Sequence, residues 1–399
     1  MGNTGIAGIA GNTGNTGNTG IAGMELFNYF LHNGKPLPYN RIPYNNCSER
    51  AIELPLALEF LERREAGTRH AYLEIGNVLN YYKPLLERSP ELANRTVIDK
   101  FEQASGVVNV DLMEYERKHD TVVCISTLEH VGQHAYGEQK RGDREAPLRA
   151  LRHVYDLLGE DGEALVTVPF GKLMDLGWLI QFSADYLDLA FSRYGIPKQA
   201  MEVSYFRKLD MEMQFDAPKQ SWIQCDRSEL AETRFDNPFV FANGIAAIRL
   251  RKRGTTAAAR PPAPQADAAL AYHPPVIVGS LYTLPFNRPA GYDLQGKLSS
   301  HSSGYVFYGP FLSLQPGAYL LQAEVALDGH GRFTLELTAE EGCKVLWSRP
   351  LSEPCSLEAV IHLPAAENDV ELRLYKHNDS ACRVRLPKLL LTAEAPIPT

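Results

Sequence analysis

The sequence predicts a doubly wound α/β domain, followed by a separate all-β sandwich of jelly-roll type. In the first 253 residues, apolar strand segments alternate with helical segments, which is typical of strand–helix–strand units. The strand segments are continuous apolar runs, as expected for a parallel sheet that is covered on both faces. After about residue 275, short segments of period-two alternation follow one another, separated by Gly, Pro, Asp and Asn.

Composition divides the chain into four regions. Residues 1–23 are a Gly/Asn/Thr repeat with too few apolar side chains to offset the entropy of ordering, so we expect a disordered tail. Residues 24–253 hold the α/β domain, and residues 254–275 are rich in Ala and Pro, as in an inter-domain linker. Residues 276–399 hold the sandwich.

The bulk numbers exclude several classes of protein. A net charge of -8 argues against a nucleic-acid partner. The 6 cysteines are scattered and form no CxxC pair, so we expect no zinc site and a reducing compartment. No run approaches the ~20 apolar residues of a transmembrane segment. No spacing of Asp or His suggests another metal site, and we expect a cytoplasmic protein.

The first elements of the α/β domain follow in a regular order. We expect a helix at residues 48–67, capped by Ser48, with Leu54, Leu58 and Leu61 on one face and Pro55 near its first turn. A short helical stretch is expected near residues 81–93. Strands are expected at residues 71–76, 95–100, 106–112, 120–127 and 163–170. Cys124 lies inside an apolar run, as a buried thiol would.

The remaining elements complete the predicted domain. A helix is expected at residues 146–159, with a stripe formed by Leu148, Leu151, Val154, Tyr155 and Leu158 and a stop at Gly159. Residues 173–216 are aromatic-rich and are expected to be helical, as a possible lid. Residues 221–225 and 240–252 are expected to close the sheet. About eight strands are expected in the sandwich, from residues 280–286 to 383–393.

Polar residues follow several of the strands at the same sheet edge. Gly76 comes directly after the first strand, and Asn77 adopts a left-handed backbone more readily than other non-glycine residues. Asp99 ends the second strand, where an acid accepts hydrogen bonds from ribose hydroxyls. Asp111 follows the third strand, within reach of an adenine ring. One glycine alone is a weak signal, and a plain buried strand and turn explains it about as well.

The ordered motifs carry a family resemblance. "YLEIGNVLNYY", "VIDKFE", "NVDLMEY", "CISTLEHVG", "LLGEDGEALVTVPFG" and "NGIAAIRLRK" together resemble a class I S-adenosylmethionine-dependent methyltransferase of the polysaccharide and O-antigen biosynthesis type. That branch has E-x-G-N-V-L in place of a fuller glycine motif. The resemblance covers roughly residues 47 to 253. Through "YGPFLSLQPGAYLLQAEV" the sandwich resembles domains of the carbohydrate-binding-module type.

The resemblance implies roles for particular residues. S-adenosylmethionine is the implied cofactor, with Glu74 orienting the loop and Gly76 and Asn77 close to the cofactor's amino acid. Asp99 would bind the ribose. The rest of the implied cofactor site comprises Asp111, Leu112, Ser126 and Glu129.

The implied acceptor is a hydroxyl of a glycan or a nucleotide sugar. Such a hydroxyl is a poor nucleophile, so a general base would help, and the candidates are His130 and His134. His130 is about as well explained as a capping or core histidine. The sandwich is a candidate for contact with sugar or with a partner, and its aromatic candidates are Tyr305, Tyr308, Trp347 and Tyr375.

Two alternatives remain open at the level of sequence. The first is a non-catalytic glycan-binding or scaffold protein with a decayed methyltransferase domain, which the shortened glycine loop favours. The second is an NAD-dependent sugar oxidoreductase or epimerase, which the acid after the second strand would suit. Tyr194 and Lys198 have the Tyr-x-x-x-Lys spacing of such enzymes, but Gly195 and Pro197 interrupt the helix that this pair requires.

Overall fold

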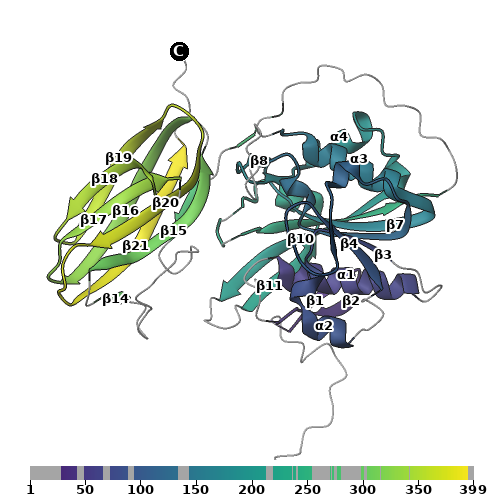
Figure 1. Ribbon diagram of the computed structural model, residues 1–399, viewed down its shortest axis with the longest axis horizontal. Helices are drawn as coiled ribbons and strands as arrows, with labels where there is room; N and C mark the ends of the chain where they lie inside the picture. The colour runs from purple at the N-terminus through teal and green to yellow at the C-terminus, as the bar shows by residue number, and fades with distance from the viewer. Residues whose placement is uncertain are drawn as a thin grey trace, which may run out of the picture.

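A computed structural model describes most of the α/β domain and most of the sandwich (Figure 1). The described residues are 28–42, 49–65, 72–88, 94–133, 143–212, 219–235, 237–239, 241–253, 270, 272–273, 276–279, 298–300, 303–314, 316–340 and 342–393. The predicted tail, most of the predicted linker and the expected strand at residues 280–286 lie outside them. No helix in the described part of the chain has the length and apolarity that crossing a membrane requires.

One sheet of eight strands, counted over the described residues, organises the N-terminal domain. Its strands are β3 (Tyr72–Ile75), β4 (Arg95–Asp99), β5 (Val107–Asn109), β6 (His119–Ile125), β7 (Leu158–Pro169), β10 (Met201–Glu212), β11 (Lys219–Cys225) and β12 (Gly244–Arg251). Their spatial order is β11-β10-β12-β7-β6-β3-β4-β5. From β5 to β7 neighbouring strands are parallel, whereas β12 runs antiparallel to both β7 and β10. Strand β11 is antiparallel to β10, so the predicted doubly wound sheet is confirmed, with β12 and β11 reversed.

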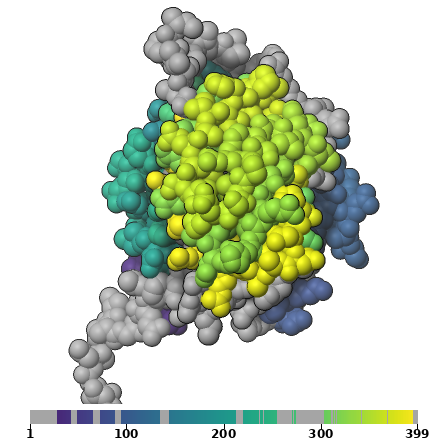
Figure 2. Space-filling view, turned by 90° about the vertical axis from the view of Figure 1, so that its left-hand side faces the viewer, coloured from purple at the N-terminus to yellow at the C-terminus, as the bar shows by residue number. Residues whose placement is uncertain are grey.

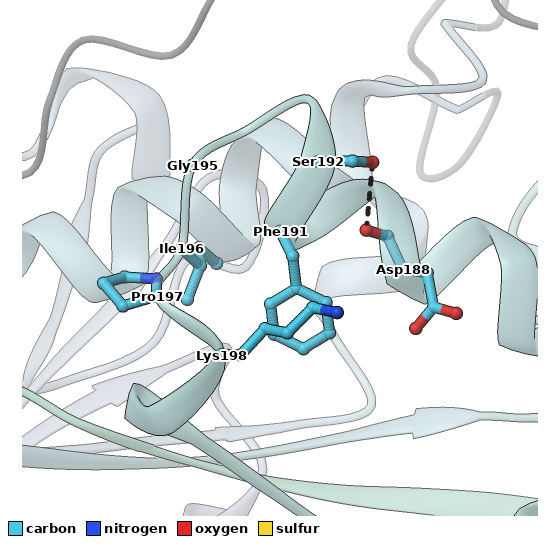
Figure 3. A pocket seen from close by; sticks show the side chains of 7 residues that line it. All are labelled: Asp188, Phe191, Ser192, Gly195, Ile196, Pro197 and Lys198. Atoms are coloured by element: carbon cyan, nitrogen blue, oxygen red, sulfur yellow. Dashed lines mark hydrogen bonds between the residues drawn. The ribbon is translucent and has the colours of Figure 1, made fainter.

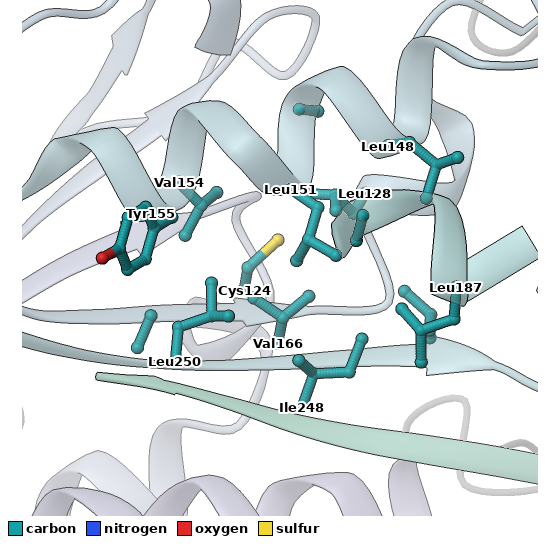
Figure 4. Packing of buried hydrophobic residues seen from close by; sticks show 14 of the residues in the cluster. Cys124, Leu128, Leu148, Leu151, Val154, Tyr155, Val166, Leu187, Ile248 and Leu250 are labelled. Atoms are coloured by element: carbon teal, nitrogen blue, oxygen red, sulfur yellow. The ribbon is translucent and has the colours of Figure 1, made fainter. Parts of the chain in front are cut away.

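Helices cover both faces of this sheet, because its strands direct apolar side chains to both faces. They are α1 (Arg50–Glu65), α2 (Lys83–Arg88), α3 (Ala146–Leu157) and α4 (Ala184–Ser192). Along β6, Val122 and Cys124 face the core under α3 and α4, and Val123 and Ile125 face the core under α1. Cys124 is fully buried among aliphatic side chains, as predicted (Figure 4).

Helix α1 continues through Pro55, which the sequence placed near the first turn. Proline has no N–H, so the carbonyl of Ala51 loses its usual helical partner. Here the backbone N–H of Asn40 donates to the Ala51 carbonyl over 2.9 Å. Leu54 and Leu61 are buried, as predicted, and Leu58 is half-buried. However, every residue from 51 to 57 is buried, so this part of the helix has no exposed face. A tertiary contact therefore stabilises a helix that sequence rules would interrupt. Ser48, the expected cap, lies outside the described residues.

Two sequence predictions about the middle of the domain were wrong. Helix α3 ends at Leu157, two residues before Gly159, because Leu158 is extended and pairs with His119 of β6. The expected helical lid at residues 173–216 is described up to residue 212, and this part contains α4, the short strands β8 (Met174–Asp175) and β9 (Ile180–Gln181), and all of β10, so it is not a helical lid. The aromatic spacing in this segment reflects core packing, since Phe182 and Tyr186 are fully buried.

The C-terminal region is an all-β sandwich, as predicted. One sheet comprises β13 (Val276–Gly279), β14 (Leu298–Ser300), β16 (Gly317–Gly329), β19 (Cys355–Leu363) and β21 (Cys382–Ala393). The other comprises β15 (Gly304–Leu314), β17 (Phe333–Ala339), β18 (Lys344–Leu351) and β20 (Glu367–Lys376). All pairings within the sandwich are antiparallel, and alternate residues of both sheets enclose one apolar core. Figure 2 looks onto the sandwich, which covers most of that face of the molecule.

Candidate functional site

The sheet order creates a switch point between β3 and β6. From β3 the chain continues to β4 and β5 on one side, and then returns to place β6 on the other side of β3. In open α/β sheets, ligands bind beyond the carboxyl ends of the two strands that flank such a reversal. The segments that follow β3 and β6 are "GNVLN" and "STLEH", which contain five of the predicted site residues.

Glu74 organises the loop after β3. Its side chain is buried, and its Oε1 accepts hydrogen bonds from the backbone N–H groups of Val78 at 3.0 Å and Leu79 at 2.7 Å. Its Oε2 accepts from Nε of Arg95 at 2.6 Å. Burial raises the pKa of Glu74, and the Arg95 charge and the loop N–H groups oppose that rise. The geometry fits the loop-orienting role implied by the sequence resemblance.

Gly76 lets the two loops of the switch point touch. Its φ of +83° lies in the left-handed region, and a Cβ there would stand 2.2 Å from Oγ1 of Thr127, in the loop after β6. No side chain fits at that distance. The glycine is therefore accounted for by loop packing, whether or not a ligand lies above it.

Asp99 joins the first loop to the second strand. Its Oδ2 accepts from the backbone N–H of Asn77 at 3.2 Å, and its Oδ1 accepts from the N–H groups of Phe101 and Glu102 at 2.9 and 2.8 Å. Glu102, which sequence reasoning missed, accepts from the Asn77 side-chain amide at 2.7 Å. Gly76, Asn77 and Asp99 are thus brought together, as the sequence predicted for one edge of the sheet.

Asp111 and Leu112 lie beyond β5, one strand farther out. Asp111 caps a short 3-10 helix, Leu112–Glu114, by accepting from the N–H of Met113 at 2.9 Å. Its other oxygen lies 3.1 Å from Nζ of Lys100, which follows β4. Leu112 is buried in the core, whereas the Asp111 carboxylate is partly exposed. The pair offers one apolar and one hydrogen-bonding surface beside the edge.

A buried acidic cluster lies at the carboxyl end of β6. Ser126, at a φ of +37°, donates its hydroxyl to Oε1 of Glu53 over 2.6 Å, and Arg50 pairs with the other Glu53 oxygen. Glu53 belongs to α1 and is fully buried. Burial raises its pKa, and the Arg50 charge opposes the rise. Arg50 and Glu53 were not predicted from the sequence to be site residues. They lie in the helix that precedes β3, and the only sequence signal there was helical periodicity.

Glu129 adds a second buried carboxyl to this cluster. Its side chain is 1% exposed, and its Oε2 has no hydrogen-bond partner among the described residues. Burial, followed by the negative charge of Glu53, raises the pKa of Glu129 well above its ordinary value. An orphaned buried oxygen of this kind is costly unless a donor or a cation approaches it.

His130 follows Glu129 and has a defined tautomer. Its Nδ1 lies 2.8 Å from the backbone carbonyl of Trp178, an acceptor, so Nδ1 carries the proton. The imidazole stacks on the Trp178 ring, and its Nε2 lies 3.9 Å from Oε1 of Glu129. Burial lowers the pKa of His130 to about 4, so the ring is neutral at physiological pH. His134, the other predicted base, lies outside the described residues.

The pair that suited a nicotinamide enzyme is not arranged for catalysis. The hydroxyl of Tyr194 donates to Glu145 over 2.6 Å, and its pKa is raised to about 12, chiefly by burial and then by Glu145. Lys198 lies instead beside an open cavity of about 510 Å³ with Asp188 and Phe191 (Figure 3). This cavity adjoins the segment that leads into β10, which runs parallel to β7, so it lies at the amino edge of the sheet.

Three of the aromatic residues predicted to contact sugar form one cluster on the sandwich. Tyr305 lies edge-to-face with Tyr375 at 5.1 Å and with Tyr308 at 5.8 Å between ring centroids. Tyr305 is 43% exposed, and Arg373 lies over its ring. Trp347 lies on β18 and packs, half-buried, against the sandwich core.

Comparisons with known proteins find different solved structures similar to the two regions of the chain. No protein-family model and no curated protein matches the chain. Among solved structures, a SAM-dependent methyltransferase from Archaeoglobus fulgidus is 15% identical, with a TM-score of 0.31 over 49% of this chain and 93% of that chain. The N-methyltransferase NodS from Bradyrhizobium japonicum, in complex with S-adenosyl-L-homocysteine, is 13% identical, with a TM-score of 0.29 over 51% and 88%.

The sandwich has similar structures of its own. The C-terminal CBM6 of LamC, from Zobellia galactanivorans, is 15% identical, with a TM-score of 0.20 over 30% of this chain and 99% of that chain. Because all these TM-scores are low, the function is inferred below from the chain's own residues.

Proposed function

We propose that the chain is an S-adenosylmethionine-dependent methyltransferase, with the cofactor lying along the carboxyl edge at the β3–β6 switch point. The observation that carries this proposal is the 3.2 Å contact between the Asn77 N–H and Oδ2 of Asp99. It supports the proposal because the glycine loop and Asp99, the acid that would bind the ribose, meet beside the switch point. Gly76 and Asp99 are therefore well within the length of one nucleoside.

The loop after β3 disfavours a dinucleotide. A pyrophosphate is usually held by free backbone N–H groups of such a loop. Here the N–H groups of Gly76, Asn77, Val78 and Leu79 bond to the Ile98 carbonyl, Asp99 and Glu74. The surroundings are acidic instead, which suits the cationic sulfonium and ammonium groups of S-adenosylmethionine.

The residues at this edge fit the parts of that cofactor. Asp99 would accept the ribose hydroxyls, and Asp111 the exocyclic amine of an adenine that rests against Leu112. The unpartnered Oε2 of Glu129 would lie toward the cationic centre, beside Ser126. When bound, S-adenosylmethionine supplies the electrophilic methyl group. The chain's own task is then to align an acceptor and remove its proton.

For the acceptor we propose a hydroxyl of a glycan or a nucleotide sugar. Nε2 of His130 bears the lone pair, because Nδ1 donates to Trp178, so Nε2 is the atom that would take the acceptor's proton. The exposed Tyr305 ring and its neighbours on the sandwich offer a stacking surface for a sugar chain. The sandwich would then hold the polymer whose hydroxyl is methylated.

A second candidate is transfer to an amine. Glu53 and Glu129 are both buried carboxyls, and only Arg50 opposes their charge inside the described part of the cluster. An ammonium group, such as that of an amino sugar, would satisfy the orphaned Glu129 oxygen better than a hydroxyl, and it would lose a proton to Glu129 or to Nε2 of His130 before its nitrogen attacks the methyl group. Product analysis after methyl transfer separates O-methyl from N-methyl sugars.

Calorimetry of the full chain with S-adenosylmethionine tests the cofactor. Asp99→Ala should weaken binding about 10- to 150-fold, since hydrogen bonds to a charged group contribute about 1.5–3 kcal/mol. Asp120→Ala, at the amino end of β6, is the matched control and should bind normally. Absence of binding to the intact protein, or equal binding by the Asp99 variant, would remove the basis of the proposal.

Methyl-labelled cofactor tests the acceptor. Incorporation into extracted polysaccharide precursors is expected with the intact chain, and His130→Gln should lower the rate about 100-fold or more while cofactor binding persists. Cofactor binding without transfer to any precursor would instead favour a glycan-binding protein with a decayed methyltransferase domain.

A further inference from the structure

A second polar constellation lies on the α1 face of the sheet, among residues distant in sequence. His32 ends the strand β1 (Tyr29–His32), Glu59 belongs to α1, and Ser204 lies on β10. Nδ1 of His32 is 2.6 Å from Oε2 of Glu59, and Nε2 of His32 is 3.3 Å from Oγ of Ser204. A carboxylate, an imidazole and a hydroxyl thus form one hydrogen-bonded chain.

The proton positions in this chain follow from its partners. A carboxylate oxygen accepts hydrogen bonds, so Nδ1 of His32 carries the proton and Nε2 directs its lone pair toward Ser204. Lys35 and Arg63 lie 3.5 and 3.4 Å from the Glu59 oxygens, so the carboxylate charge is compensated. This is the arrangement in which a histidine accepts the proton of a serine.

Asn33 supplies a positioned donor at the same place. It lies with Gly34 in the turn of the β1–β2 hairpin, β2 being Lys35–Pro38, and both residues have positive φ, at 50° and 78°. Its amide is held by Gln224, which donates to Asn33 Oδ1 over 2.9 Å and accepts from the Asn33 N–H over 2.7 Å. This fixes Nδ2 of Asn33 at 3.3 Å from Nε2 of His32. Nδ2 carries two N–H groups, so one can donate to Nε2 of His32 and the other can stabilise an oxyanion.

A small cavity opens beside these groups. It is lined by His32, Asn33 and Ser204 together with parts of α1, β7 and β12, and its volume is about 40 Å³. One water molecule requires roughly 10–15 Å³ on the same measure, so the space suits a group of about three non-hydrogen atoms. His32 is 9% exposed, and Ser204 is half-buried and accessible from the cavity.

We propose that Ser204 and His32 are catalytic residues of a second active site, which cleaves short acyl esters such as acetate esters, with Glu59 as the positioning residue. Three atoms of an acetyl group match the space beside Ser204, and a longer acyl chain does not. The site lies about 9 Å along α1 from the acidic cluster at Glu53, at 1.5 Å per residue. It is independent of the proposed methyl transfer.

The reaction balances with water as the second substrate. Ser204 Oγ attacks the ester carbonyl carbon and its proton passes to Nε2 of His32, while Asn33 Nδ2 donates to the oxyanion. The bond to the alcohol oxygen breaks, and the alcohol leaves with the proton from His32. Water then attacks the acyl-serine through the same base, which releases the carboxylic acid and restores the Ser204 hydroxyl.

Full-length protein and p-nitrophenyl acetate provide the test. We expect a burst of nitrophenol, one acetyl group mapped to the Ser204 peptide, and much slower reaction with the hexanoate ester. Ser204→Ala and His32→Gln should each lower the acetylation rate about 100- to 10,000-fold. Glu59→Gln should lower kcat and leave KM unchanged, because it keeps the side-chain shape but no longer fixes the histidine tautomer.

Controls separate catalysis from a role in holding the hairpin. Ser221→Ala, at a buried serine on the neighbouring strand β11, should react like the unchanged protein. Urea unfolding reports whether each variant folds, and Ser204→Cys keeps a nucleophile at the same place if alanine disturbs the packing. Iodoacetamide should then alkylate Cys at this position faster with His32 present than with His32→Gln. Acetylation elsewhere, or Ser204 and His32 variants that react as fast as the unchanged protein, would mean that the trio only anchors the β1–β2 hairpin.

Discussion

Replacement of Gly76 by alanine is expected to destabilise the N-terminal domain much more than the same change at Gly106. The two glycines have nearly equal φ values, +83° and +82°, so the backbone cost of alanine, about 1–2 kcal/mol, is the same at both. A Cβ at Gly106 would meet nothing within 4 Å. A Cβ at Gly76 would lie 2.2 Å from Oγ1 and 2.9 Å from Cγ2 of Thr127.

The difference in unfolding free energy between Gly76→Ala and Gly106→Ala measures how closely the loops after β3 and β6 pack. Overpacking of a fixed site costs about 1–3 kcal/mol, so Gly76→Ala should cost about 2–5 kcal/mol in all. Thr127→Ala removes the two nearest atoms and leaves only the Thr127 Cβ, 3.0 Å from the new methyl group. The double variant should therefore recover most of the excess, a coupling of about 1–2 kcal/mol.

Urea unfolding followed by tryptophan fluorescence gives this comparison directly. The chain has 3 tryptophans, and in a Trp347→Phe background only Trp178 and Trp222, both in the N-terminal domain, report. Equal losses at Gly76 and Gly106, or no recovery with Thr127→Ala, would refute the inference that the glycine is needed for contact between the loops after β3 and β6.

Three further predictions concern buried charged and polar groups. The pKa of Glu129 is raised in the folded chain, so the stability that its protonated form contributes at low pH is lost as pH rises through that pKa. Glu129→Gln should therefore stabilise the domain at neutral pH by about 1–3 kcal/mol. Equal urea midpoints of the variant and the unchanged protein at neutral pH would contradict this. Arg95→Met should cost about 3–5 kcal/mol in the same assay, because it leaves the Glu74 carboxylate buried and unpaired, and adding Glu74→Gln should restore most of the loss. Burial raises the pKa of the Cys124 thiol, so iodoacetamide should modify exposed Cys343 in the folded protein and spare Cys124 until unfolding, as peptide mapping would show.

Local sequence pattern was sufficient for most of the N-terminal sheet. The apolar runs at β3, β4, β6 and β7 were long enough to identify strands, and small or polar residues soon after each run marked its carboxyl end. The pattern misled at β10, where "MEVSYFRKLDME" mixes charged and aromatic residues. Lys208 is buried there with its ammonium over the ring of Trp222, a contact that depends on β11 being the neighbouring strand.

The sequence pattern was sufficient to predict that Gly76 and Asp99 lie together at one sheet edge, but not to predict the groups around them. Gly76 and Asp99 each follow a strand, and parallel strands bring their carboxyl ends to one edge. Glu53 reaches Ser126 from a helix 73 residues earlier. The Asn33-Gly34 pair was the one overlooked local signal, since Asn-Gly between short apolar segments is typical of a two-residue hairpin turn.

By itself, the sequence determined the type and order of most of the elements, because hydrophobic periodicity and turn residues act over a few positions of the chain. Tertiary structure alone decided which side chains meet across elements. His32 and Ser204 are 172 residues apart, and they touch because the β1–β2 hairpin packs over the sheet at a particular strand and register. The same holds for the orphaned oxygen of Glu129, since whether a carboxyl finds a partner depends on which neighbours packing brings within about 3 Å.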